Sequence, residues 1–233
     1  MTETEQKSQY NETFANALQW LWGDGFLAPG GPEDVAALMQ DVDAKGRDVL
    51  DIGCGLGVIS VMLADIYGAK SVVGIDVEQH LIDHSTQRAA AAGVADRVSF
   101  KLVEPGPLPF DDASLDVVFS KDVIVHIPDK QGFYKDILRV LKPGGVLVGS
   151  DWLRGGEGHF SDTADQWLEL VHLNFQMKNL EQTREALQAA GFADVELNDR
   201  NAFHRGEVAK EVALLSEKFD ELVERIGQEQ ADY

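Results

Sequence analysis

Three acidic side chains stand at or just after the ends of three successive β-branched runs: Asp51, Asp76 and Glu104. The carboxyl ends of parallel strands meet at one edge of a sheet, so we expect these carboxylates to lie together there. Asp76 stands where a doubly wound fold places the acid that binds both ribose hydroxyls. No basic phosphate clamp accompanies the three acids, which favours a nucleoside ligand without phosphates.

A glycine-rich turn at residues 53–57 joins the first of these runs to a helical pattern. Glycines there let the backbone approach a ligand closely and adopt positive φ. Their spacing is G-x-G-x-G, whereas a dinucleotide fingerprint is G-x-G-x-x-G, so a pyrophosphate fits less well. A tight structural turn without a ligand is the alternative. The residues expected to contact the ligand are Asp51, Gly53, Cys54, Gly55 and Gly57.

A second polar group follows the fourth β-rich run, in the segment 121–128. Since the ordinary pKa of histidine is near 6.5, His126 can remove a proton from an ammonium or orient it. Asp122, one helical turn earlier, can attract a cation. A purely structural hydrogen bond is the alternative role for His126.

The hydrophobic pattern alternates between two kinds of element that position these residues. Short β-branched runs predict strands at 48–52, 71–75, 98–103, 115–120, 146–150 and 195–197. Amphipathic patterns between them predict helices at 58–67, 78–92, 130–141 and 180–190. The order predicts an α/β fold with a doubly wound, mostly parallel sheet and helices on both faces.

Two helical tracts, at 11–21 and 208–226, lie outside that alternation. We expect residues 1–32 to form an N-terminal helical lid, 33–200 the core and 201–233 a C-terminal amphipathic helix. The stretch 210–233 contains no strand-like run. A sheet without a final strand would expose a hydrophobic edge, which predicts either a further segment of chain or a homodimer partner that covers it.

Composition limits the function classes. The 233 residues are 44% hydrophobic and 26% charged, which indicates a globular protein and no membrane span. Forty acidic against 20 basic side chains give a net charge of -20, which argues against nucleic acid as a partner. One cysteine cannot form an internal disulfide, and the polar first residues lack a signal peptide, so we predict a cytoplasmic location. No metal site is predicted.

Four motifs in order resemble those of the class I S-adenosylmethionine-dependent methyltransferases: DIGCGLG (51–57), GIDVE (74–78), LPFDDASLDVVFS (108–120) and LRVLKPGGVLVGSDW (138–152). The resemblance covers roughly residues 20 to 200. It implies a Rossmann-like methyltransferase fold, S-adenosylmethionine as cofactor and S-adenosylhomocysteine as product. Methyl transfer from a sulfonium is an in-line displacement, so positioning and an unprotonated acceptor matter most.

Within that class, the segments WGDGFLAPGG (22–31) and SKDVIVH (120–126) resemble the phosphoethanolamine N-methyltransferases. In that group an N-terminal tyrosine closes over the ligands and pairs with the histidine after the fourth strand, positions that Tyr10 and His126 match. The cofactor-binding residues implied by the resemblance are Leu27, Ala28, Asp76, Val77, Glu104, Pro105 and Lys121.

One departure affects the acceptor. Where that group binds phosphate through tyrosines and an arginine, this sequence places Trp152, Leu173 and Phe175. Leucine cannot replace a bidentate arginine, whereas two aromatic rings beside Asp122 suit a cationic amine or a sulfonium product. Basic side chains elsewhere could still supply an anion site, namely Arg154, Lys178, Arg200 and Arg205.

The sequence therefore predicts an S-adenosylmethionine-dependent methyltransferase that acts on a small molecule, with an amine as the expected acceptor. An O- or S-methyltransferase is one alternative, since a thioether acceptor needs no base. A non-catalytic binding protein or a nicotinamide-dependent enzyme of the same fold class is the other.

Overall fold

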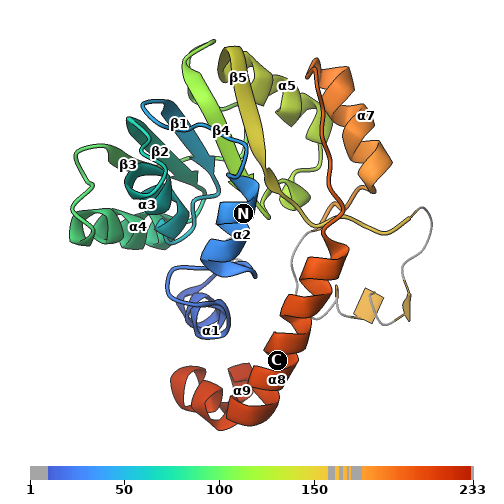
Figure 1. The fold of residues 1–233 in the computed structure, drawn as a ribbon. Helices are drawn as coiled ribbons and strands as arrows, with labels where there is room; N and C mark the ends of the chain where they lie inside the picture. The colour runs from blue at the N-terminus through green and yellow to red at the C-terminus, as the bar shows by residue number, and fades with distance from the viewer. Residues whose placement is uncertain (1–9, 157–160, 163–164, 167, 169–174, 232–233) are drawn as a thin grey trace, which may run out of the picture.

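One parallel sheet forms the centre of the molecule. The computed structural model describes residues 10–156, 161–162, 165–166, 168 and 175–231. Within them the strands pair in the order β3-β2-β1-β4-β5 (Figure 1). Their bounds are β1 Asp48–Ile52, β2 Ser71–Asp76, β3 Val98–Leu102, β4 Leu115–Lys121 and β5 Leu141–Ser150. The chain order reverses between β1 and β4, and a doubly wound sheet binds ligands at such a point, outside the carboxyl ends of the strands.

Helices cover both faces of the sheet because alternate strand residues point to opposite sides. Val49 and Val117 belong to one hydrophobic cluster, and their neighbours Leu50 and Val118 belong to the other. The first cluster packs under α2 (Gly31–Leu38), α3 (Val58–Asp65) and α4 (Gln79–Ala91). The second packs under α5 (Lys130–Val140) and α7 (Leu180–Ala190). This confirms the predicted doubly wound α/β fold with helices on both faces.

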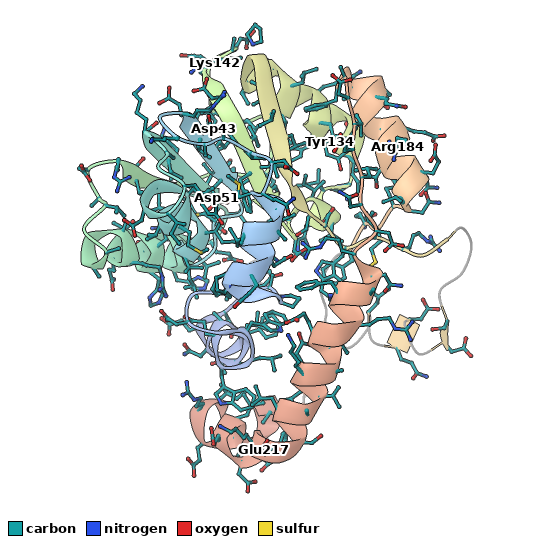
Figure 2. The ribbon with its side chains drawn as sticks, viewed as in Figure 1. Asp43, Asp51, Tyr134, Lys142, Arg184 and Glu217 are labelled. Carbon is teal, nitrogen blue, oxygen red and sulfur yellow. The ribbon has the colours of Figure 1, made fainter. Side chains whose placement is uncertain are left out.

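The remaining helices lie at the carboxyl edge of the sheet. Helix α1 (Glu12–Trp22) packs against α8 (Asn201–Ile226), which leaves the sheet and ends near the short α9 (Gln228–Ala231) (Figure 1). Glu217, labelled in Figure 2, lies beside a kink at Lys218, after which α8 continues to Ile226. Asn11 caps α1 by accepting the Phe14 N–H at 3.0 Å. A 3-10 turn, η1 (Ile124–His126), follows β4.

The predicted strand at 195–197 is wrong. Val195 and Leu197 pack against the cluster under α5 and α7, and Arg184 donates to the Val195 carbonyl at 2.8 Å, but neither residue joins the sheet. These hydrophobic residues are therefore partly buried against helices instead of being paired in a ladder. The strand signal came from their β-branched and alternating pattern, which reports burial as well as pairing.

Several helix boundaries also differ from the predictions, and one helix was missed. Helix α3 ends at Asp65 and not at residue 67, and α4 spans Gln79–Ala91 and not 78–92. The helix expected to reach Leu141 ends at Val140, because β5 begins at once and absorbs the Pro-Gly-Gly segment in a register shift opposite β4. Helix α2 was not predicted, since Gly30, Gly31 and Pro32 suggest a loop. Helix α8 starts at Asn201, two turns before the predicted residue 208.

Among the described residues, no helix has the length and apolar character that a membrane crossing requires. In the same part of the chain, no cluster of three or more histidine, cysteine or carboxylate side chains could hold a metal ion.

Candidate active site

A cavity of about 1500 Å³ opens at the carboxyl ends of β1, β2 and β4. Its walls contain every residue that the sequence analysis assigned to the cofactor or acceptor except Asp51 and Gly57. These residues are Tyr10, Leu27, Ala28, Gly53, Cys54, Gly55, Asp76, Val77, Glu104, Pro105, Lys121, Asp122, His126, Trp152 and Phe175. The fold thus brings together, around one cavity, side chains that lie as far apart in the sequence as Tyr10 and Phe175.

The glycine turn after β1 is fixed to the end of β2. The Gly53 N–H donates to the Ile75 carbonyl at 2.8 Å, and the Gly55 N–H donates to the Asp76 carboxylate at 2.9 Å. Gly53 has a φ of 68°, and a Cβ there would lie 2.2 Å from a methyl carbon of Val123. A larger residue would therefore push the turn and the segment after β4 apart.

Asp76 connects the turn to α4 and still faces the cavity. Its second oxygen accepts the N–H groups of Val77 at 2.8 Å and Glu78 at 3.1 Å. A carboxylate offers about four acceptor positions, so these bonds and the one to Gly55 do not exhaust it. Desolvation raises the pKa of Asp76. Glu104, after β3, is exposed and lines the same cavity.

Asp51 and Gly57 support the turn without lining the cavity. Asp51 is 2% exposed and accepts the Ser60 hydroxyl at 2.5 Å, and its burial raises its pKa to about 7. Figure 2 labels it within the sheet region. Gly57, with a φ of 80°, begins α3, and a Cβ there would lie 2.6 Å from the Cβ of Ser85 on α4. The observed contacts of these two residues shape the turn from behind, and their contact with a ligand stays a prediction.

The loop between α1 and α2 lies over the glycine turn. Arg88 on α4 holds it through two bonds to the Asp24 carboxylate, at 2.7 and 3.0 Å, and donates to the Leu56 carbonyl at 3.0 Å. The ion pair lowers the pKa of Asp24. A methyl carbon of Leu27 lies 3.1 Å from where a Gly55 Cβ would stand. The loop between α1 and α2 therefore covers the glycine turn.

Lys121 is the centre of a buried charge network. Its ammonium lies 2.6 Å from the Asp122 carboxylate, 3.1 Å from that of Asp34 and 3.0 Å from the Pro29 carbonyl. Asp34 also pairs with Arg200 at the start of α8. The network joins the end of β4, α2 and α8. The sequence analysis assigned Lys121 to the cofactor, and the structure shows that protein groups engage its ammonium.

Tyr10 and His126 meet across the cavity. Their ring centroids are 6.3 Å apart, with the planes at 86°. The backbone carbonyl of Tyr10 lies 2.6 Å from His80 Nε2 on α4. Desolvation, together with the negative charges of Asp122 and Asp76, raises the pKa of Tyr10 to about 12, so its phenol stays protonated at neutral pH.

His126, Trp152, Phe175 and His204 form what we call the aromatic wall. The His126 and Phe175 rings have centroids 5.2 Å apart, and Phe175 stacks on Trp152 at 6.5 Å with 12° between the planes. His204 meets Trp152 edge-on at 4.4 Å. Four rings from four separate segments thus line one part of the cavity.

Several cavity residues were missed by the sequence analysis. From α1 they are Phe14, Leu18 and Trp22, and from α8 they are His204, Val208 and Glu211. Trp22 donates to the Glu211 carboxylate at 2.7 Å, which fastens the two helices together. The available signal was helical spacing: both sets lie one or two turns apart on one face of their helix.

Asp151 was also missed, although it directly follows β5 beside Trp152. It accepts the Val125 N–H at 2.9 Å, and the Gln176 N–H donates to the Val125 carbonyl at 2.6 Å. Both bonds fix the turn that carries His126. Desolvation raises the pKa of Asp151 to about 7, while the charge of Lys130 opposes the shift.

The basic side chains considered as an alternative anion site do not line the cavity in the described part of the chain. Arg200 pairs with Asp34 and stacks over the Phe203 ring at 4.4 Å. Arg154, Lys178 and Arg205 are likewise absent from its described walls. Leu173, which marked the departure from the phosphate-binding pattern, lies outside the described residues.

Comparison with known proteins identifies a family model described as "Methyltransferase domain", which matches residues 43–179. A phosphoethanolamine N-methyltransferase of Triticum aestivum is 30% identical over 225 residues, 96% of this chain and 43% of its own length. Phosphoethanolamine N-methyltransferase 2 of Caenorhabditis elegans is 28% identical over 229 residues, 97% of this chain and 51% of that protein. The chain thus spans about half the length of these relatives.

Solved structures extend the similarity to three dimensions. Haemonchus contortus phosphoethanolamine N-methyltransferase 2 in complex with S-adenosyl-L-methionine matches with a TM-score of 0.88 and 27% identity, over 97% of this chain and 52% of that one. The same enzyme with phosphomonomethylethanolamine and S-adenosylhomocysteine matches with a TM-score of 0.87 over the same shares.

Proposed function

We propose that this chain, which belongs to the methyltransferase domain family, transfers a methyl group from S-adenosylmethionine to the nitrogen of a small amine. One observation carries the proposal: the cavity brings the glycine turn and Asp76 together with Asp122 and His126. The solved relative bound to S-adenosyl-L-methionine supports the cofactor, and the phosphoethanolamine N-methyltransferases support an amine acceptor. The family match favours methyl transfer over the nicotinamide-dependent alternative.

The residues of the cavity fit S-adenosylmethionine. When bound, this cofactor supplies a methyl group on a positively charged sulfur. Asp76 would accept hydrogen bonds from the ribose hydroxyls, as the acid after the second strand does in doubly wound folds. Following the family pattern, we assign Val77 to the ribose, Glu104 and Pro105 to the adenine, and Leu27 and Ala28 to the amino-acid tail. A nucleoside without phosphates suits walls that are rich in carboxylates.

The acceptor end can prepare an amine for attack. Asp122 attracts the protonated amine, and His126 takes its proton so that the nitrogen has a free lone pair. With the cofactor bound, the nitrogen–carbon bond would form as the methyl carbon–sulfur bond breaks, which would leave S-adenosylhomocysteine, and His126 would pass the proton to water. Because the Tyr10 phenol stays protonated, it serves as a hydrogen-bond donor that positions the ligands and not as a base.

We also propose that α1, with Tyr10, acts as a lid. Its Phe14, Leu18 and Trp22 side chains line the cavity, and α8 supplies the opposite wall. The division into lid (1–32), core (33–200) and C-terminal helix (201–233) agrees with this role, since each part contributes to the cavity. The cytoplasmic location and the homodimer stay predictions from the sequence.

A labelled-methyl assay tests the function. The protein is incubated with methyl-labelled S-adenosylmethionine and, separately, ethanolamine, phosphoethanolamine, glycine derivatives and thioethers. We expect label on the nitrogen of one or more amines. Label only on a thioether or hydroxyl would support the S- or O-methyltransferase alternative, and no label on any acceptor would contradict an enzymatic role.

A further inference from the structure

We propose that the acceptor end of this cavity takes a small amine or quaternary ammonium that carries no phosphate group. This inference rests on the proposed function and specifies its substrate class. It separates the chain from the phosphate-bearing ligand named for the solved relative, phosphomonomethylethanolamine.

The charge of the cavity favours a cationic ligand over a phosphate. Its described walls contain one lysine and no arginine, against seven carboxylates: Asp76, Glu78, Glu104, Asp122, Asp129, Asp136 and Glu211. Such a lining produces a negative potential that concentrates cations and repels phosphate. The net charge of -20 over the whole chain adds to the same field.

The single lysine of the described walls has no N–H donor left for a phosphate. An ammonium group has three N–H donors. The Lys121 ammonium has three acceptors within hydrogen-bond distance, the Asp122 and Asp34 carboxylates and the Pro29 carbonyl. Since a phosphate needs charge-assisted donors, it would have to displace one of these buried partners.

Among the described residues, no lysine or arginine other than Lys121 lines the cavity. Arg200 is engaged by Asp34 outside the cavity. The internal segments outside the described residues, 157–160, 163–164, 167 and 169–174, contain neither lysine nor arginine in the sequence. They therefore cannot supply the guanidinium or ammonium that the described walls lack.

The aromatic wall provides the attractive part of the site. Ring faces attract ammonium groups, and aromatic sites are used to recognise methylated ammonium ligands. Trp152 and Phe175 lie nearly parallel and line the same cavity as the Asp122 carboxylate. Ring faces need no N–H donor, so the wall tolerates each methyl group that the reaction adds to the nitrogen.

A pair of matched ligands tests the inference by calorimetry on the full chain with S-adenosylhomocysteine bound. Choline and phosphocholine share the quaternary ammonium and differ only in the phosphate. We expect choline to bind at least 10-fold more tightly. Equal or tighter binding of phosphocholine, or no binding of choline, would overturn the inference. The affinity for S-adenosylhomocysteine is measured first. If the protein does not bind it, the proposed function fails, and this result is separate from the comparison of choline with phosphocholine.

Two substitutions at one position sharpen the test. Phe175→Leu removes a ring without adding charge, and we expect it to weaken choline binding about 2- to 30-fold with no gain for phosphocholine. Phe175→Arg supplies the missing guanidinium, and we expect it to shift the preference toward phosphocholine by at least 10-fold relative to Phe175→Leu. Unchanged choline affinity in Phe175→Leu, with its fold retained by circular dichroism, would contradict the role of the aromatic wall.

Discussion

The Lys121 ammonium lies 2.6 Å from the Asp122 carboxylate. Asp122 has a φ of 58°, which is unusual outside glycine. The same ammonium lies 3.1 Å from Asp34, and all three side chains are largely buried. Lys121 therefore holds together the end of β4, the start of α2 and, through Asp34, the beginning of α8.

Replacing this lysine should destabilise the fold. Lys121→Met leaves the Asp34 and Asp122 carboxylates without their shared cation, and removing one partner of a buried ion pair costs about 3–5 kcal/mol. We expect a loss of this size in the free energy of unfolding, measured with urea. Lys135→Met, at an exposed position on α5, is the matched control and should change stability by less than about 0.5 kcal/mol. Similar stability of both variants would contradict the central role of Lys121.

His126 should matter for turnover and not for cofactor binding. General acid–base catalysis contributes about 10²- to 10⁴-fold, so we expect His126→Ala to lower kcat within that range. The affinity for S-adenosylhomocysteine should change by less than about 3-fold, which is under 1 kcal/mol, because His126 is assigned to the acceptor and not to the cofactor. Tyr10→Phe should lower kcat less, because it removes only a hydrogen-bond donor. Equal turnover in wild type and His126→Ala would remove the proposed role.

Gly53→Ala should damage the glycine turn by steric contact. The added Cβ would stand 2.2 Å from Val123, in a backbone conformation with positive φ. Gly46 also has a positive φ, of 71°, but nothing lies within 4 Å of its Cβ position. Gly46→Ala therefore reports the backbone strain alone, about 1–2 kcal/mol. We expect Gly53→Ala to lose more stability than this control and to bind S-adenosylhomocysteine at least 10-fold more weakly.

The buried Asp51 predicts how stability changes with pH. Its pKa is raised from 3.8 to about 7, so the folded protein holds a proton that the unfolded chain releases near pH 4. The resulting stabilisation is present below pH 4 and is lost as the pH rises to about 7. Asp51→Asn removes this contribution while its amide oxygen can still accept the Ser60 hydroxyl. Relative to wild type, the variant should gain stability between pH 5 and pH 8, by up to about 3 kcal/mol.

Thermal unfolding of both proteins at pH 5 and pH 8 measures this effect. Asp48 is a suitable contrast, because hydrogen bonds from Ser71 and Lys70 lower its pKa to about 2. Its contribution is present above pH 4 and is lost as the pH falls toward 2. The same pH dependence in Asp51→Asn and wild type would show that Asp51 does not hold its proton at pH 5.

The sequence predicted the sheet well because its signals are local. Strands β1 to β4 were located within one residue of their ends. For β1, β2 and β4 the reason is that Val- and Ile-rich runs typical of buried parallel strands have few other interpretations. Leu197 and Val195 carry the same signal, yet they lack a strand partner. Pairing depends on distant segments, which a local pattern does not report.

The candidate site shows the same contrast between residues that local motifs predict and residues that only tertiary contacts bring together. Asp76, the glycine turn and His126 were found because motifs follow the strands directly. His204 and Glu211 lie on a helix far along the chain, and only the packing of α8 on α1 brings them to the cavity. The burial of Asp51 and the three partners of Lys121 likewise depend on tertiary contacts. These could not be inferred from residue types alone.

Calorimetric titration of S-adenosylhomocysteine into wild type and Asp76→Asn tests the central claim most directly. The substitution keeps the size of the side chain and removes the charged acceptor, and a hydrogen bond to a charged group contributes about 1.5–3 kcal/mol. We predict saturable binding to wild type and about 10- to 150-fold weaker binding to the variant, with the two thermal unfolding curves used to correct for any loss of fold. No binding to wild type, or equal affinities in the two proteins, would contradict a nucleoside site at the end of β2.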